Sequence, residues 1–114
     1  MSQAELIRVR VDGNNRVVSL STEHLNQMAA ARQLGIDLND LFEEQSDATR
    51  WSLDFRDVDR ITSVGLNELI GINSQARSRG VQLVLLDVCE TVRDVFALTR
   101  LERLFEFESS PVSA

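Results

Sequence analysis

The chain has 114 residues, of which 12 are basic and 18 acidic, and its formal net charge is −6. This length permits one domain with one hydrophobic core, and no apolar run approaches the roughly 18 residues that a membrane span needs. All basic residues are Arg and they are scattered, which argues against a nucleic-acid partner and excludes chemistry that requires Lys.

The chain begins with a pattern typical of a β-hairpin. Leu6–Val11 and Arg16–Leu20 are β-type runs, and Asp12–Asn15 between them contains residues that tolerate a positive φ. The alternation of charged and apolar residues over Met1–Val11 indicates a strand rather than a signal sequence. We therefore expect a cytoplasmic protein with no direct membrane insertion.

The next segment has a weaker pattern that favours two helices. Glu23–Gln33 is compatible with a helix that ends at Gly35. A second, short helix is expected through Asp40–Glu44, where Asp37 or Asn39 can cap it and the acidic residues suit the helix dipole. One of these two helices is expected to link the hairpin to the third strand.

The stretch around position 60 carries most of the functional information. Apolar and polar residues alternate over Trp51–Phe55, which predicts a strand with one face against a core. Asp57–Arg60 then forms a polar turn, and Thr62 and Ser63 stand where a helix N-cap is expected, just before Gly65. In open α/β sheets, ligands and partners usually bind at this edge.

A strong helical pattern and a buried strand follow. Val64–Arg79 is predicted to be a helix that stops at Gly80. The side chains expected to point inward are those of Leu66, Leu69, Ile70, Asn73 and Ala76. Val81–Val88 is almost entirely apolar and short, which favours a central strand.

The last part of the chain predicts a helix and an edge strand. A helix opened by Glu90 or Thr91 is expected to end near Thr99, and Arg100–Phe107 is long enough for a short turn and a strand. The residues expected to face inward on the helix are Val92, Val95, Phe96 and Leu98. Residues 109–114 are expected to form a flexible tail.

The predicted order of elements is β-β-α-β-α-β-α-β, which indicates an α/β domain over residues 1–108. Helices that follow strands as right-handed crossovers predict a mixed sheet of about five strands with the helices mainly on one face. The chain shows no linker or internal repeat that would suggest a second domain.

In this order of motifs, the chain resembles a STAS domain, the fold shared by anti-sigma-factor antagonists and the cytoplasmic tails of sulfate transporters. The resemblance implies a fold like that of SpoIIAA. It covers about Ile7 to Phe107. The segments that carry it are Ser52–Phe55, Val58, Ile61, Thr62–Leu66, Arg77–Gly80, Leu83–Leu86, Leu98–Leu101 and Leu104–Phe105.

The resemblance implies a phosphorylation site at the junction of the third strand and its helix. In antagonists this junction typically reads Asp-Ser-Ser-Gly, and a partner anti-sigma kinase phosphorylates the first serine. Thr62 stands where the aspartate would be, Ser63 is the phosphorylatable serine, Val64 replaces the second small residue and Gly65 matches. Arg100 stands where a glycine is common.

Two interpretations of the junction hydroxyls remain open. Ser63 is either an N-cap that stabilises the helix by about 1 kcal/mol or a phosphorylation site, with Thr62 as the lesser candidate. Asp54, Asp57 and Asp59 are more simply a solvated acidic turn than a cation site. The predicted partner-binding residues are Asp57, Asp59, Arg60, Thr62, Ser63, Val64, Gly65 and Asn67.

The leading functional hypothesis is a non-enzymatic regulatory domain that binds an anti-sigma factor with serine kinase activity. An alternative is a constitutive scaffold or subunit of a transporter or ATPase complex, in which the junction binds but is not phosphorylated. A weaker alternative is a nucleotide-binding domain or small enzyme, although no glycine-rich phosphate loop exists.

With one Cys and one His, we expect no metal site and no cofactor. The oligomeric state stays open between a monomer and a weak dimer.

Overall fold

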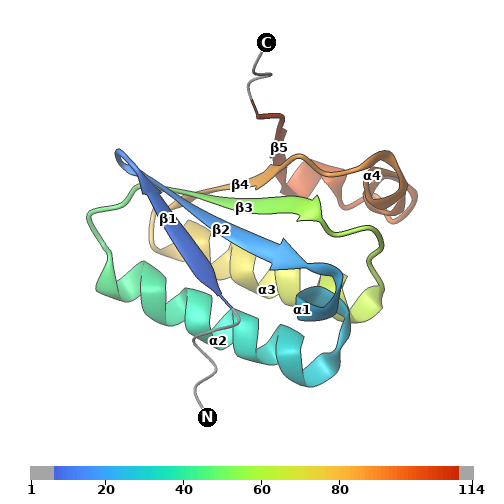
Figure 1. The fold of residues 1–114 in the computed structure, drawn as a ribbon, viewed down its shortest axis with the longest axis horizontal. Helices are drawn as coiled ribbons and strands as arrows, with labels where there is room; N and C mark the ends of the chain where they lie inside the picture. Colours follow the sequence, from blue (N-terminus) through green and yellow to red (C-terminus); the bar gives the residue numbers. More distant parts are fainter. Residues whose placement is uncertain (1–6, 111–114) are drawn as a thin grey trace.

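The computed structural model describes residues 7–110, which form one five-stranded sheet with helices packed against it (Figure 1). The strands are β1 (Arg8–Asp12), β2 (Asn15–Ser21), β3 (Arg50–Asp57), β4 (Gln82–Leu86) and β5 (Glu106–Glu108). The helices are α1 (Thr22–Asn26), α2 (Met28–Glu44), α3 (Ser63–Ser78), α4 (Glu90–Leu98) and the 3₁₀-helix η2 (Glu102–Leu104). None of the helices in this part of the chain is long and apolar enough to cross a bilayer.

The order of the strands explains why the helices share one face. The sheet order is β1-β2-β3-β4-β5, with β1 antiparallel to β2 and every later pair parallel. Each parallel crossover therefore steps in the same direction, and right-handed crossovers of this kind place their helices on the same side. Figure 1 shows α2 and α3 together beneath the sheet. The predicted α/β fold, with a mixed sheet and helices mainly on one face, is confirmed.

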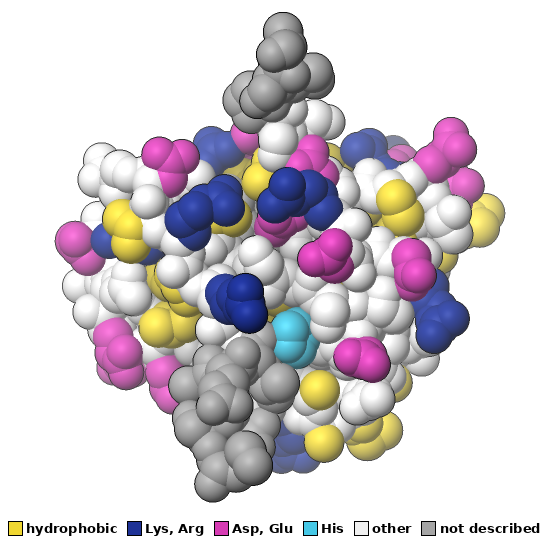
Figure 2. Space-filling model, viewed as in Figure 1, with side chains coloured by type: hydrophobic (Ala, Val, Ile, Leu, Met, Phe, Trp, Pro, Cys, Tyr) yellow, Lys and Arg dark blue, Asp and Glu magenta, His cyan; other side chains and the backbone are white. Residues whose placement is uncertain are grey.

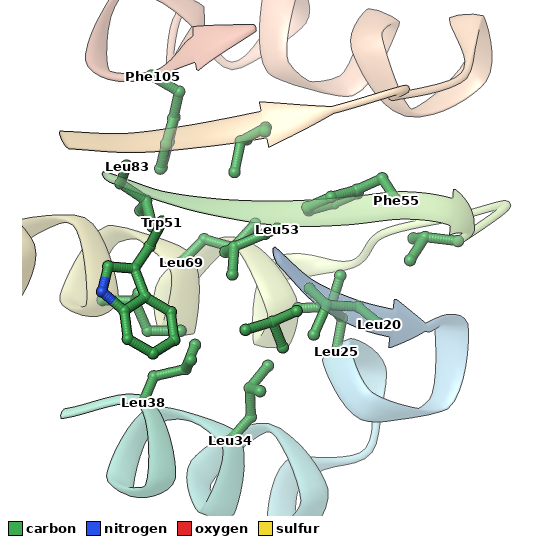
Figure 3. Close-up of a cluster of buried hydrophobic side chains, with 14 of the residues drawn as sticks. Leu20, Leu25, Leu34, Leu38, Trp51, Leu53, Phe55, Leu69, Leu83 and Phe105 are labelled. Atoms are coloured by element: carbon green, nitrogen blue, oxygen red, sulfur yellow. The ribbon is translucent and has the colours of Figure 1, made fainter. Parts of the chain in front are cut away.

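The centre of the core is the helix-facing side of β3. Trp51, Leu53 and Phe55 are fully buried, and Figure 3 shows them pointing toward the side chains of the helices. The Trp51 ring meets Phe42 of α2 edge-on, with 5.3 Å between the ring centroids. The other labelled side chains of this cluster are Leu20, Leu25, Leu34, Leu38, Leu69, Leu83 and Phe105.

The opposite side of β3 is also buried, although no crossover helix covers it. The Asp54 carboxylate is only 4% exposed and pairs with Arg56 at 2.9 Å. Arg50 pairs with Glu108, and this ion pair joins β3 to β5 across the intervening strand β4. The expectation that Asp54 belongs to a solvated turn is therefore wrong, because long charged side chains shield this face of the sheet.

The prediction of two helices separated at Gly35 is also wrong. The helix α2 runs without interruption through Gly35, and the break lies instead at Gln27, whose extended backbone separates α1 from α2. The inward stripe of α2 continues across the glycine through Ala31, Leu34, Leu38 and Phe42. Packing of this stripe outweighs the helix-breaking tendency of one glycine, which is about 1 kcal/mol.

Several inward-facing assignments need correction. Ile70 and Leu98 are exposed, whereas Ile72 is buried and takes the core position that the sequence suggested for Ile70.

Ser110, which was expected to lie in a flexible tail, donates its backbone and hydroxyl hydrogens to the Asp87 carboxylate. These bonds lower the pKa of Asp87. Residues 1–6, with which the expected first strand begins, and residues 111–114 of the expected tail lie outside the described residues.

Two helices end in the same C-terminal motif with different residues at the left-handed position. After α3, Gly80 has φ +71°, and the amides of Gly80 and Val81 donate to the carbonyls of Arg77 and Ala76. After α4, Arg100 has φ +61° with the equivalent pair of hydrogen bonds. This is the Schellman arrangement, in which glycine is the preferred residue. It explains physically why a glycine suits the position of Arg100.

We predict that Arg100→Gly stabilises the fold. A left-handed backbone costs a non-glycine residue about 1–2 kcal/mol, and the added freedom of glycine in the unfolded chain returns about 0.4–1 kcal/mol of that. The free energy of unfolding should therefore rise by roughly 0.5–1 kcal/mol, measured by urea denaturation with the fluorescence of the single, buried Trp51. Arg32→Gly, within α2, is the matched control and should lower stability by about 0.8 kcal/mol. An unchanged or lower stability for Arg100→Gly would contradict this account.

Candidate functional site

The candidate site lies at the carboxyl end of β3, where the chain enters α3. Thr62 occupies the N-cap position with an extended backbone, and Ser63 is the first residue of a 16-residue helix. Both side chains are exposed. Among residues 7–110, no acceptor forms a hydrogen bond with the backbone amides of Ser63, Val64 or Gly65, and the first helical bond runs from Leu66 to the Thr62 carbonyl. The site therefore presents unpaired amides at the positive end of a helix dipole.

Asn26 forms hydrogen bonds with Thr62, the residue whose side chain would otherwise cap this helix. Its Oδ1 accepts hydrogen bonds from the Thr62 amide at 2.8 Å and from the Thr62 hydroxyl at 3.0 Å. The Thr62 hydroxyl forms no side-chain capping bond to α3. The interpretation of Ser63 as the N-cap is therefore wrong: Thr62 is at that position, and Ser63 lies one residue inside the helix with its hydroxyl exposed.

A second contact fixes the loop before α3 to α1. The Thr22 hydroxyl donates to the Asp59 carboxylate at 2.8 Å and accepts from the Asp59 amide at 2.9 Å. Asn26 adds a bond from its Nδ2 to the Arg60 carbonyl at 2.8 Å. The loop between β3 and α3 is thus held by side chains of a five-residue helix that lies far from it in sequence.

A capping box defines the start of α1. The Ser21 hydroxyl accepts from the His24 amide, and His24 Nδ1 accepts from the Ser21 amide at 3.0 Å. This second bond requires an unprotonated Nδ1. Burial lowers the pKa of His24, partly offset by Glu23, so the imidazole is neutral at neutral pH and the cap is intact.

Gly65 lets α3 approach α1 closely. A Cβ atom at this position would lie 2.9 Å from the Leu25 carbonyl oxygen and 2.9 Å from Ile61 Cγ1. Both distances are shorter than van der Waals contact, and one of them is to backbone. The glycine of the junction is therefore needed for helix packing, whatever partner the site binds.

Most of the predicted partner-binding residues are accessible in the structure. Six of them are exposed: Asp57, Asp59, Arg60, Thr62, Ser63 and Asn67. Val64 is half-buried, and Gly65 is buried beneath α1, so Gly65 can act only through packing. Sequence reasoning missed Thr22 and Asn26, because nothing in their local spacing shows that they face a loop more than thirty residues away.

The described part of the chain contains one further residue with a reactive side chain, Cys89. Cys89 is exposed at the start of α4, with its Sγ 3.6 Å from the Val58 carbonyl oxygen. Within residues 7–110, no group of three His, Cys, Asp or Glu side chains is arranged to hold a metal ion. On the face shown in Figure 2, basic and acidic side chains are interspersed.

Comparison with known proteins identifies the family. The family model described as "Mlab, STAS domain" matches residues 7–106. The chain belongs to the STAS domain family. The comparison with curated proteins gave no match.

Solved STAS structures share the fold at low sequence identity. The crystal structure of TM1081 from Thermotoga maritima has a TM-score of 0.78 at 22% identity, covering 93% of this chain and 87% of that one. An anti-sigma-factor antagonist (STAS) domain protein from Planctomyces limnophilus has a TM-score of 0.75 at 16% identity, with coverages of 92% and 91%.

SpoIIAA, an anti-sigma factor antagonist, is similar in two states. Its unphosphorylated form has a TM-score of 0.73 at 17% identity, covering 92% of this chain and 88% of that chain. The phosphorylated form from Bacillus has a TM-score of 0.66 at 17% identity, with coverages of 92% and 91%. At these identities the likeness concerns the fold.

We predict opposite effects of alanine at two glycines of α3. Gly65→Ala should destabilise the fold by about 1–3 kcal/mol, because the new methyl group collides with the Leu25 backbone. Gly71→Ala should stabilise it by up to about 1 kcal/mol, because nothing lies within 4 Å of the new Cβ and alanine favours the helix. Urea denaturation of both variants checks the difference. Equal effects would show that the contact between α1 and α3 does not depend on the missing side chain.

Proposed function

We propose that this STAS domain is a non-enzymatic regulatory module that docks on an anti-sigma factor with serine kinase activity. The docking surface is formed by the loop before α3 and by the first turn of that helix. Phosphorylation of Ser63 weakens the docking. The observation that carries this proposal is the exposed Ser63 hydroxyl beside helix amides that have no acceptor among the described residues.

The geometry is suited to a phosphate that stays bound to its own helix. A phosphoserine carries a charge of about −1.5 to −2 and three strong acceptor oxygens, and the unpaired amides of α3 supply donors for them. The helix dipole contributes a further ~0.3–1 kcal/mol at an exposed site. The same charge placed in a docked interface must lose water without a guaranteed partner, which disfavours the complex.

The family supports a switch of this kind. SpoIIAA has the same fold and is known in phosphorylated and unphosphorylated forms. In this chain, hydrogen bonds from Thr22 and Asn26 hold the loop that immediately precedes Ser63. A modification at Ser63 would therefore change the charge of the surface without first having to order the loop.

A second candidate function is a constitutive subunit of a transporter or ATPase complex, in which the same surface binds without phosphorylation. The observation that favours it is the replacement of the antagonists' aspartate by Thr62, whose hydroxyl is already bound to Asn26. A kinase that recognises the aspartate would find no carboxylate there. A pull-down that recovers a membrane ATPase instead of a kinase would support this candidate.

We predict that Ser63→Glu weakens binding of the partner serine kinase by at least about tenfold, whereas Ser63→Ala changes it by less than about threefold. The reason is that only the charged variant adds a negative charge that must lose water when the interface forms. Titration calorimetry with the purified kinase measures both. Ser46→Glu is the matched control, because Ser46 is exposed at the opposite end of β3 and should leave the affinity unchanged.

Mass spectrometry after incubation with this kinase and ATP tests the modification itself. The expected result is one phosphate, located on Ser63. Absence of phosphate from both Thr62 and Ser63, together with unchanged affinity in Ser63→Glu, would refute the switch.

A further inference from the structure

A groove separates α2 from α3 on the outer side of the helix layer. Its volume is about 580 Å³, and residues of both helices form its walls. They are Met28, Arg32, Gly35, Ile36 and Asn39 of α2 and Val64, Asn67, Glu68, Gly71, Ile72 and Gln75 of α3. The groove begins beside Ser63, because Val64 and Asn67 belong both to its wall and to the predicted docking surface.

The α2 wall exposes large apolar side chains. Met28 is 73% exposed and Ile36 is 49% exposed, although both lie on a helix whose other face is packed in the core. The facing wall adds the half-buried Val64 and the buried Ile72. An apolar strip inside a groove is a surface from which an occupant would displace water.

Gly71 keeps the groove open at a cost to the stability of α3. A glycine within a helix costs about 0.8–1.0 kcal/mol relative to alanine. At Gly65 the close packing against α1 requires a glycine, because a Cβ there would collide with Leu25. A Cβ at Gly71, in contrast, would meet nothing within 4 Å. The fold itself therefore gives no reason for a glycine at position 71, whereas close approach of another backbone would give one.

The groove also contains two charges without a partner among the described residues. The ion pairs in residues 7–110 are Arg16–Asp47, Arg50–Glu108 and Arg56–Asp54, so neither Glu68 nor Arg32 takes part in one. Glu68 is half-buried, and its carboxylate lies against Gly35 of the facing helix. The other residues of the α3 wall carry no charge.

From these features we infer that the groove receives an amphipathic helix of the partner protein. The apolar stripe of that helix packs on Met28 and Ile36, its backbone passes close to Gly71, and one Arg or Lys reaches the carboxylate of Glu68. Glu68, half-buried and without an ion pair, selects a cationic side chain on the occupant, and Arg32 on the facing wall selects an anionic one. This charge complementarity defines the occupant. This inference rests on the proposed docking function and assigns a partner element to it.

The experiment measures binding of two purified proteins, a serine kinase and a membrane ATPase, each taken from a pull-down with this chain as bait. Gly71→Leu adds a side chain to the groove, its Cβ meets no atom within 4 Å, and the variant should weaken binding by at least about 30-fold. Ile36→Glu, on the opposite wall, should have a similar effect, and Glu68→Gln should weaken binding about tenfold and reduce its dependence on salt. Ser74→Leu is the matched control, since Ser74 is exposed on α3 outside the groove and should leave affinity within about twofold.

The outcomes separate this inference from the function on which it rests. If Gly71→Leu and Ile36→Glu bind like the wild type while Ser63→Glu does not, the proposed docking function holds but the groove is not the binding site. If neither purified protein binds the wild-type chain, both proposals fail. If sedimentation shows that the wild type self-associates and Gly71→Leu abolishes this, the occupant is a second copy of the chain and the partner helix is refuted.

Discussion

The arrangement of the candidate site in this STAS domain depends on one side-chain amide, that of Asn26. Its two donors go to the carbonyls of Thr22 and Arg60, and its oxygen accepts from the amide and hydroxyl of Thr62. An asparagine side chain has no further capacity, so every hydrogen bond that it can make joins α1 to itself or to the loop before α3. The bound Thr62 hydroxyl does not cap α3, and the first amides of that helix face a surface with an exposed hydroxyl, that of Ser63.

The topology determines where such a surface can form. Parallel strands added in one direction place their crossover helices on the same side, so α2 and α3 pack beside each other and leave a groove on their outer surface. The carboxyl end of β3 brings the start of α3 to one end of that groove. Two glycines of α3 then have different roles: Gly65 allows the contact with α1, and Gly71 leaves the groove open.

Much of the fold could be predicted from the sequence, because period-2 and helical patterns are local. The strand at Trp51–Phe55, the stop at Gly80 and the final edge strand follow from such patterns. The uninterrupted α2 could not be predicted in the same way, since a glycine is tolerated there through packing of the helix. The roles of Asn26 and Gly65 depend on contacts between segments that are far apart in the sequence, and no local pattern encodes those contacts.

Amide hydrogen exchange at the start of α3 tests the central claim most directly. NMR spectroscopy of the wild-type chain and of Asn26→Ala would follow the amides of Thr62, Ser63 and Val64. The account predicts that the Thr62 amide exchanges more slowly than the other two in the wild type and loses this protection in the variant. Equal protection of all three amides, or a Thr62 amide that stays protected in Asn26→Ala, would contradict it.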